Sequence, residues 1–242
     1  MFYYYGVDWT YILMVLPALI FSLIASARVN STFKKYSQMS TMRGMTGAEA
    51  AHRVLMANGV SGVRIERISG NLTDHYDPKA NVIRLSDSVY DATSPAAVGV
   101  AAHEAGHAVQ YATNYAPIKL RAAIVNATNF GSKLAMPLIF LGILLMGIQS
   151  LSEYSEVFYY LALVGVFCFG LCVVFQLVTL PVEFNASRRA VETIEQTNML
   201  TDEERKGARK VLSAAAMTYV AALAVSLMQF LRLLMLVNRR RD

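Results

Sequence analysis

The sequence predicts a mainly α-helical integral membrane protein, in which a hairpin of two transmembrane helices interrupts a small α+β domain. Of its 242 residues, 55% are hydrophobic and only 16% are charged, and the mean hydropathy is +0.38. The chain is therefore more apolar and less charged than an average soluble domain. The net charge is +5, but lysine and arginine gather at the ends of apolar runs, which is typical of membrane topology, so we expect no nucleic-acid partner.

Residues 1–28 are expected to form the first transmembrane helix. Its apolar run extends from about residue 11 to residue 27, follows Trp9 and ends at Arg28. The run is long enough for a short span, and tryptophan is a typical anchor at the membrane surface. No positively charged segment precedes the run, so we do not expect a cleaved signal peptide.

Residues 29–133 form a polar block that we interpret as the first part of a folded domain. Thr46, with a glutamate three residues later, is a capping box and predicts the start of a helix. Two segments, 63–68 and 82–85, have the composition of strands and predict a small sheet. Ser94 followed by proline predicts the start of a second helix.

Residues 134–180 contain two further apolar runs, 134–148 and 157–180, which predict a transmembrane hairpin. The loop between them has two glutamates and no lysine or arginine, whereas basic residues flank the hairpin on both sides. By the positive-inside rule the loop lies outside and both polar flanks lie in the cytosol. Residues 181–210 are then the second part of the cytosolic domain.

Residues 211–242 are expected to form a C-terminal hydrophobic helix with a basic tail. The apolar stretch, 211–237, is long enough to span, but it contains Arg232 and is followed by Arg239, Arg240 and Arg241. A fourth span would place this tail outside, against the positive-inside rule. Either the rule is overridden here, or the helix packs in the bundle or along the membrane surface without crossing.

His103, Glu104 and His107 form an H-E-x-x-H pattern within the second predicted helix. Residues four apart lie on the same face of a helix, so both imidazoles can reach one metal ion. The glutamate beside the first histidine can take a proton from an attacking water, and zinc lowers the pKa of such a water to about 7. The pattern therefore predicts a metal site with a general base.

A catalytic zinc site needs a third protein ligand and keeps a position open for water. Glu183, which follows the third apolar run, is the best candidate for this ligand, although it could simply mark the exit of the helix from the membrane. Asp202 is the second candidate, but its surroundings resemble a solvated helix start. Two histidines and one carboxylate suit zinc better than cobalt or manganese.

Several motifs together resemble the YugP-type membrane zinc metallopeptidases. They include residues 72–78 (LTDHYDP), 101–110 (AAHEAGHAVQ) and 181–184 (PVEF). The layout is also similar to that of HtpX-like peptidases, in which a transmembrane hairpin interrupts the catalytic domain. The resemblance implies a zincin-like domain with bound Zn²⁺, protein or peptide substrates and a bacterial host. The charge asymmetry described above places the active site of this multi-pass cell-membrane protein, in contact with membrane lipid, on the cytosolic side.

The chain departs from the HtpX-like pattern at Ser187. In that group an aspartate follows the glutamate ligand by four residues, and this chain has Ser187 at that place. An aspartate that supports the metal ligands is therefore not expected here.

Four further residues are weaker candidates for contacts with the substrate or the transition state. Residues 74–87 include His75 and could supply an edge strand that aligns an extended peptide, although a lone histidine near a turn is more often structural. Arg188 and Arg189 could stabilise an oxyanion, or they could be positive anchors of membrane topology. Tyr219 could donate a hydrogen bond, or it could mark a close helix contact among its alanine neighbours.

Two functions from different classes fit these observations. The first is a zinc-dependent endopeptidase that hydrolyses membrane or membrane-proximal proteins, with Glu104 as the general base. An ATP-driven peptidase of the FtsH type is not expected, because this chain has no G-x-x-x-x-G-K-[ST] loop. The alternative is a non-enzymatic, metal-stabilised membrane scaffold or assembly partner. A structural zinc has four protein ligands, and the sequence offers three besides Glu104, which favours the enzyme.

Overall fold

The computed structural model describes residues 3–4 and 7–239. Over these residues the chain is mainly helical and contains a three-stranded sheet and a two-stranded ribbon, β1 (Tyr3–Tyr4) with β2 (Val7–Asp8). Four of the described helices are long and apolar enough to cross a membrane. The predicted class, a mainly α-helical membrane protein with a small sheet, is therefore confirmed. Arg240 and Arg241 of the expected basic tail lie outside the described residues.

The chain divides into two compact units. The first contains Met1–Leu23, Leu120–Thr179 and Tyr219–Asp242, and the second contains Ile24–Lys119 and Leu180–Thr218. The apolar runs fall mostly in the first unit, and the polar segments fall mostly in the second. Four long helices contribute to both units: α1 (Leu16–Ser37), α4 (Ala116–Met146), α5 (Ser155–Gln196) and α6 (Asp202–Arg239).

In the first unit, α4 and α5 pack closely through small residues. A Cβ added at Gly142 would lie 2.7 Å from the carbonyl oxygen of Phe158, and one at Gly165 would lie 2.8 Å from the carbonyl oxygen of Ala135. Two helix backbones can approach this closely only where no side chain intervenes, as is common between membrane helices. The 3₁₀ helix η2 (Gln149–Tyr154) connects the two helices. One cluster of buried apolar residues in this unit comprises Ile139, Tyr159, Ala162, Val166, Leu233 and Val237.

An ion pair joins α6 to the start of the first helix within the first unit. Asp8 accepts hydrogen bonds from the backbone N–H groups of Thr10 (3.1 Å) and Tyr11 (3.2 Å), where the π-helical turn η1 (Tyr11–Val15) leads into α1. Arg232 of α6 donates through Nε to the same carboxylate at 3.0 Å, and its guanidinium lies 5.2 Å from the centroid of the Tyr11 ring. The arginine in the last apolar run therefore has a carboxylate partner, as charged groups within membranes require.

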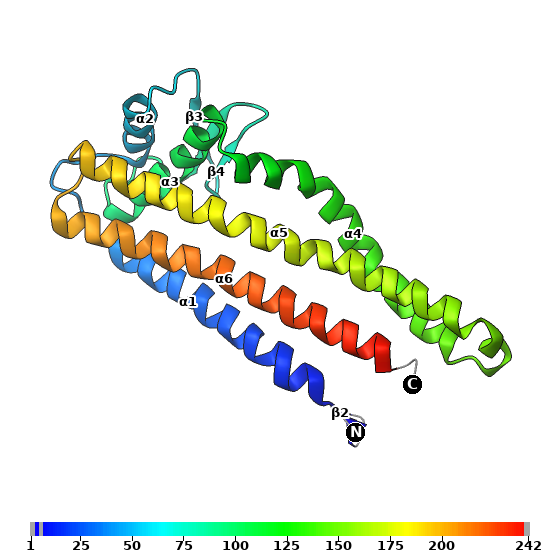
Figure 1. Ribbon diagram of the computed structural model, residues 1–242. Helices are drawn as coiled ribbons and strands as arrows, with labels where there is room; N and C mark the ends of the chain where they lie inside the picture. The colour runs from blue at the N-terminus through cyan, green and yellow to red at the C-terminus, as the bar shows by residue number, and fades with distance from the viewer. Residues whose placement is uncertain (1–2, 5–6, 240–242) are drawn as a thin grey trace. The chain divides into compact units, whose positions relative to one another are not determined.

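The second unit combines the three-stranded sheet with two shorter helices. The sheet has the order β3 (Arg64–Ile68), β5 (Val82–Ser86) and β4 (His75–Asp77), with β3 parallel and β4 antiparallel to β5. The helices α2 (Gly47–Ala57) and α3 (Pro95–Ala112) belong to the same unit (Figure 1). The strands expected at 63–68 and 82–85 are confirmed, and β4 is an edge strand within residues 74–87.

Both helix starts predicted from capping residues are confirmed in this unit. The hydroxyl of Thr46 accepts a hydrogen bond from the N–H of Glu49 at 3.2 Å, and the Glu49 carboxylate accepts one from the N–H of Thr46 at 2.9 Å. The hydroxyl of Ser94 accepts from the N–H of Ala97 at 3.2 Å at the start of α3. Such caps each stabilise a helix by about 1 kcal/mol. The core that these helices close against the sheet includes Val54, Ile83, Leu85, Val98, Val109 and Ile194.

The helices α4 and α5 extend well beyond their apolar runs. The run at 157–180 is only part of α5, which continues without a break through Pro181 to Gln196. In the same way α4 begins at Ala116, ahead of the run at 134–148. A change from apolar to polar side chains alters the surroundings of a helix but does not end it. Glu183 is therefore held on a helix rather than on a loop.

Candidate metal centre

The helix α3 carries His103 and His107 on one face. The two rings lie one helical turn apart, with centroids separated by 4.7 Å and planes inclined by 83°. Gly106, between them, faces α5, because a Cβ at this position would lie 2.8 Å from the carbonyl oxygen of Ala186. The glycine lets the two backbones approach, and this brings both histidines within reach of side chains from α5.

Glu183 of α5 is the third member of the cluster. Its Oε2 lies 3.3 Å from Nε2 of His103 and 3.5 Å from Nε2 of His107. The ligand atoms all lie within 4.8 Å of one another, and no other such group of three occurs in the described chain. Ligand atoms that share a tetrahedral zinc ion at about 2.0–2.1 Å are about 3.3 Å apart. The chemistry and the spacing of these three side chains therefore fit zinc.

The electrostatics of the cluster also favour a cation. Burial by itself lowers the pKa of His107, but the hydrogen bond with Glu183 and the negative charge of Glu104 outweigh this effect and raise the pKa above its ordinary value. The Glu183 side chain is only 3% exposed, so its charge is poorly screened by water. Positive charge between the three side chains is therefore stabilised.

Gln110 determines which nitrogen of His107 carries the proton. Its Nε2 donates to the backbone carbonyl of Val182 at 2.7 Å and to Oδ1 of Asn185 at 3.0 Å. A carbonyl oxygen can only accept, so the Oε1 of Gln110 is the atom that faces Nδ1 of His107 at 3.0 Å. Nδ1 must then be the donor, so Nε2, which faces Glu183, is the ring nitrogen left to bind a metal ion once it gives up its proton.

Ser187 contacts Nδ1 of His103, as Gln110 contacts Nδ1 of His107. Its Oγ lies 3.1 Å from Nδ1 of His103. The serine stands four residues after Glu183, where the HtpX-like pattern has an aspartate, so a neutral hydroxyl supports the ring here. Sequence reasoning noted Ser187 without this contact and missed Gln110. The signal for Gln110 was its position three residues after His107, on the same helical face.

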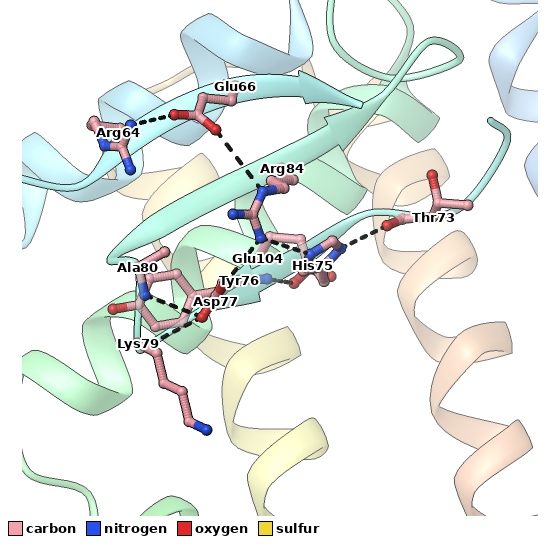
Figure 2. Close-up of polar contacts among 10 residues, drawn as sticks. All are labelled: Arg64, Glu66, Thr73, His75, Tyr76, Asp77, Lys79, Ala80, Arg84 and Glu104. Carbon is pink, nitrogen blue, oxygen red and sulfur yellow. Dashed lines mark hydrogen bonds and ion pairs between the residues drawn. The ribbon is translucent and has the colours of Figure 1, made fainter. Parts of the chain in front are cut away.

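Glu104 is directed toward the sheet rather than into the three-residue cluster. It is 9% exposed, and its Oε2 accepts a hydrogen bond from the backbone N–H of Tyr76 on β4 at 3.0 Å (Figure 2). The N–H of this edge-strand residue therefore points to Glu104. The contact joins residues far apart in the sequence and orients one carboxylate oxygen.

His75 lies on β4, and its ring contacts one residue just before this strand and one residue of the neighbouring strand β5. Its Nδ1 lies 2.9 Å from the carbonyl oxygen of Thr73, and its Nε2 lies 3.3 Å from Nη1 of Arg84 (Figure 2). Arg84 also donates to Asp77 at 3.0 Å. These contacts favour the structural interpretation of His75.

Three of the remaining candidates make contacts with other side chains. Arg188 is exposed and lies 3.9 Å from the carboxylate of Glu192, whereas Nε of Arg189 donates to Asn185 at 2.8 Å. Asp202 is 81% exposed and pairs with an arginine one turn later. Tyr219 belongs to the first unit. The oxyanion and substrate contacts suggested for Arg188, Arg189 and Tyr219 therefore stay predictions.

Fold and site together define a class of protein: a helical membrane protein with a partly buried His-His-Glu cluster that suits zinc. The chain belongs to the family described as "Putative neutral zinc metallopeptidase", which matches residues 11–238, and this family implies Zn²⁺ as the cofactor. It is also 44% identical to "Putative membrane protease YugP" of Bacillus subtilis (strain 168) over 232 residues, which cover 96% of this chain and 98% of the relative. No solved structure matches. The resemblance that the motifs indicated is thus confirmed.

Proposed function

We propose that the chain is a zinc-dependent endopeptidase that cleaves membrane or membrane-proximal proteins on the cytosolic side of the cell membrane. The observation that carries this proposal is the convergence of His103, His107 and Glu183, whose ligand atoms lie within 4.8 Å of one another. Membership of a zinc metallopeptidase family supports it. Three protein ligands leave one coordination position open, as in catalytic zinc sites.

The residues of the cluster would hold zinc through Nε2 of His103, Nε2 of His107 and a carboxylate oxygen of Glu183. When bound, zinc supplies Lewis-acid chemistry, which lowers the pKa of a water to about 7 and polarises a peptide carbonyl. Gln110 and Ser187 keep the two rings oriented through their Nδ1 atoms. Because Glu183 is the only anionic residue among the three proposed ligands, a site that held zinc would keep a net positive charge, which would favour an oxyanion on the substrate.

Glu104 acts as the general base in this proposal. The N–H of Tyr76 orients its Oε2 at 3.0 Å, and the carboxylate takes the proton of the attacking water. It then passes the proton to the nitrogen of the leaving peptide, so that the amine departs neutral and the carboxylate is regenerated. General acid–base help of this kind contributes about 10²–10⁴-fold to a rate.

The edge strand β4 supports a peptide as the substrate. Tyr76 lies on this strand, and its N–H is bonded to Glu104, so one edge of the sheet lies beside the proposed base. Pairing with an edge strand fixes the direction of an extended peptide and the position of its scissile carbonyl. Glu183 follows the apolar run at 157–180 on the same helix, which favours substrates in or near the membrane.

The competing function is a non-enzymatic scaffold held together by a metal. A structural zinc has four protein ligands. In the described part of the chain the cluster offers three, and Glu104 is bonded to a backbone N–H of the sheet instead. The contacts therefore favour the enzyme.

A pair of variants tests the roles of the two glutamates. The purified full-length protein in detergent is expected to cleave unfolded casein, and a chelator should abolish this cleavage. Glu104→Gln should lose at least about a hundredfold in turnover while it retains zinc, because the base is not a ligand. Glu183→Gln should lose zinc. Zinc loss in the first variant, or full occupancy in the second, would show that the roles are wrong, and zinc binding without any cleavage by wild type would favour the scaffold.

A further inference from the structure

A cavity in the second unit is lined by residues of α1 and α6. It has a volume of about 610 Å³, and it does not include the histidines or Glu183. The polar side chains that line it are cationic or carry hydroxyl groups, and none of the described lining residues is a carboxylate. The cations are Arg28, Lys35 and Lys210, and the hydroxyls are those of Ser31, Thr32, Tyr36 and Ser213.

Carboxylates leave the three cations of this cavity largely unneutralised, although the hydrogen bond from Lys206 and, to a smaller extent, the charge of Lys210 lower the pKa of Glu203. None of them forms an ion pair with a described acidic side chain, although the Lys35 ammonium lies 5.6 Å from the centroid of the Tyr36 ring. Basic residues at the polar end of α6 behave differently, because Arg205 pairs with Glu195 at 2.9 Å and Lys206 pairs with Glu203 at 2.6 Å. Positive charge at the cavity is therefore available to a ligand that carries negative charge.

The cavity lies where both helices change from polar to apolar. On α1 the apolar run ends directly before Arg28, and on α6 the apolar stretch begins directly after Lys210. Apolar side chains lie next to the cations, since Ile24 is 60% exposed and Met217, which lines the cavity, is 37% exposed. A ligand here would meet cations and hydroxyls at one end and hydrocarbon at the other.

We propose that this cavity binds the phosphate group of an anionic phospholipid, with the acyl chains along the apolar surfaces of α1 and α6. Phosphate oxygens accept hydrogen bonds from ammonium, guanidinium and hydroxyl groups, and basic pockets between membrane helices are suited to lipid head groups. Free inorganic phosphate shares the polar half of this chemistry but makes no use of Ile24 and Met217. This inference does not depend on the peptidase function.

Two double variants that lose the same charge test whether the lipid binds at this cavity or is attracted by any basic residue on these helices. Lys35→Gln with Lys210→Gln removes two cations of the cavity. Lys34→Gln with Arg209→Gln removes the neighbouring cations on the same two helices, which do not line it. Each basic residue near an anionic lipid contributes about fivefold to binding, so the first variant, which removes two, should lose roughly twenty-five-fold. The second variant should stay within a few fold of wild type.

The measurement uses full-length protein in detergent and short-chain phosphatidylglycerol, with phosphatidylcholine and inorganic phosphate as comparison ligands. Wild type should bind phosphatidylglycerol more tightly than phosphatidylcholine, inorganic phosphate should not displace it, and Lys35→Arg with Lys210→Arg should retain binding. The melting temperature of each variant is measured as a control that it is folded. Equal losses in the two glutamine variants, equal binding of both lipids, or displacement by inorganic phosphate would each overturn the proposal.

Discussion

Replacement of Gln110 should weaken zinc binding without unfolding the protein, because this side chain alone holds the proton on Nδ1 of His107. Gln110 is fully buried, and its side-chain amide forms hydrogen bonds with His107, Val182 and Asn185. In Gln110→Leu the Nδ1–H of His107 loses its acceptor, and the ring is free to adopt the other tautomer or to rotate. Loss of such a partner typically costs 10–100-fold in metal affinity. Loss of the hydrogen bonds should also lower the free energy of unfolding by about 1–3 kcal/mol.

Gln110→Glu separates the two effects. A carboxylate still accepts from Nδ1 of His107, so zinc affinity should stay within a few fold of wild type. It cannot donate to the carbonyl of Val182 or to Oδ1 of Asn185, so the melting temperature should fall. Thr113→Val is the matched control on α3, because its hydroxyl bonds only to carbonyls of its own helix, at Val109 and Gln110.

Competition with a chromophoric chelator measures zinc affinity, and thermal unfolding in detergent measures stability. If folded Gln110→Leu binds zinc as tightly as Thr113→Val does, the assignment of Gln110 as a positioning residue is refuted. Ring ¹⁵N chemical shifts of His107 give a second readout, since the structure requires the proton on Nδ1 in wild type.

Three further predictions concern metal, topology and pH. Bound metal would join α3 to α5, so it should add roughly 2.7 kcal/mol to the free energy of unfolding at a metal concentration a hundred times the dissociation constant. A chelator should remove this contribution and lower the melting temperature of wild type. The double variant His103→Ala, His107→Ala should not respond, and a chelator effect of wild-type size in it would contradict the ligand set. A reporter fused near Ser152 should be exported and one near Gly59 should stay cytosolic; the reverse pattern would overturn the charge argument. Burial raises the pKa of Asp74 above its ordinary value despite opposing hydrogen bonds. The stability that this group contributes is therefore present at low pH and lost as the pH rises through the raised pKa. Asp74→Asn should raise the melting temperature at neutral pH but not below the ordinary pKa of aspartate, and a melting curve at each pH checks this.

Local chemistry made the helix starts and the candidate ligands predictable. Thr46 and Ser94 accept hydrogen bonds from N–H groups three residues later, so a few neighbouring residues in the sequence suffice to predict these helix starts. The same holds for His103 and His107, whose spacing alone places them on one helical face. Glu183 could be selected because it comes directly after the third apolar run, whereas the two other histidines precede the motif, but its distance from His103 and His107 came only from the structure.

Contacts between distant segments could not be predicted in this way. The hydrogen bond from Tyr76 to Glu104 depends on how β4 packs beside α3, and no local pattern encodes that packing. The ion pair of Asp8 and Arg232 joins residues 224 apart in the sequence. Hydropathy alone did not predict how far α5 continues beyond its apolar run, because side-chain polarity reports the solvent around a helix rather than its end.

The division of the proposed ligands between α3 and α5 has a consequence for biosynthesis. His103 and His107 leave the ribosome well before Glu183, and 75 residues lie between His107 and that glutamate. A nascent chain that has not yet reached α5 holds only two of the three ligands and cannot complete the site. On this ligand set, peptide-bond cleavage begins only after the intervening apolar segments have been synthesised. On the proposed function, an unfinished copy of the protein therefore cannot cleave its neighbours in the membrane during its own insertion.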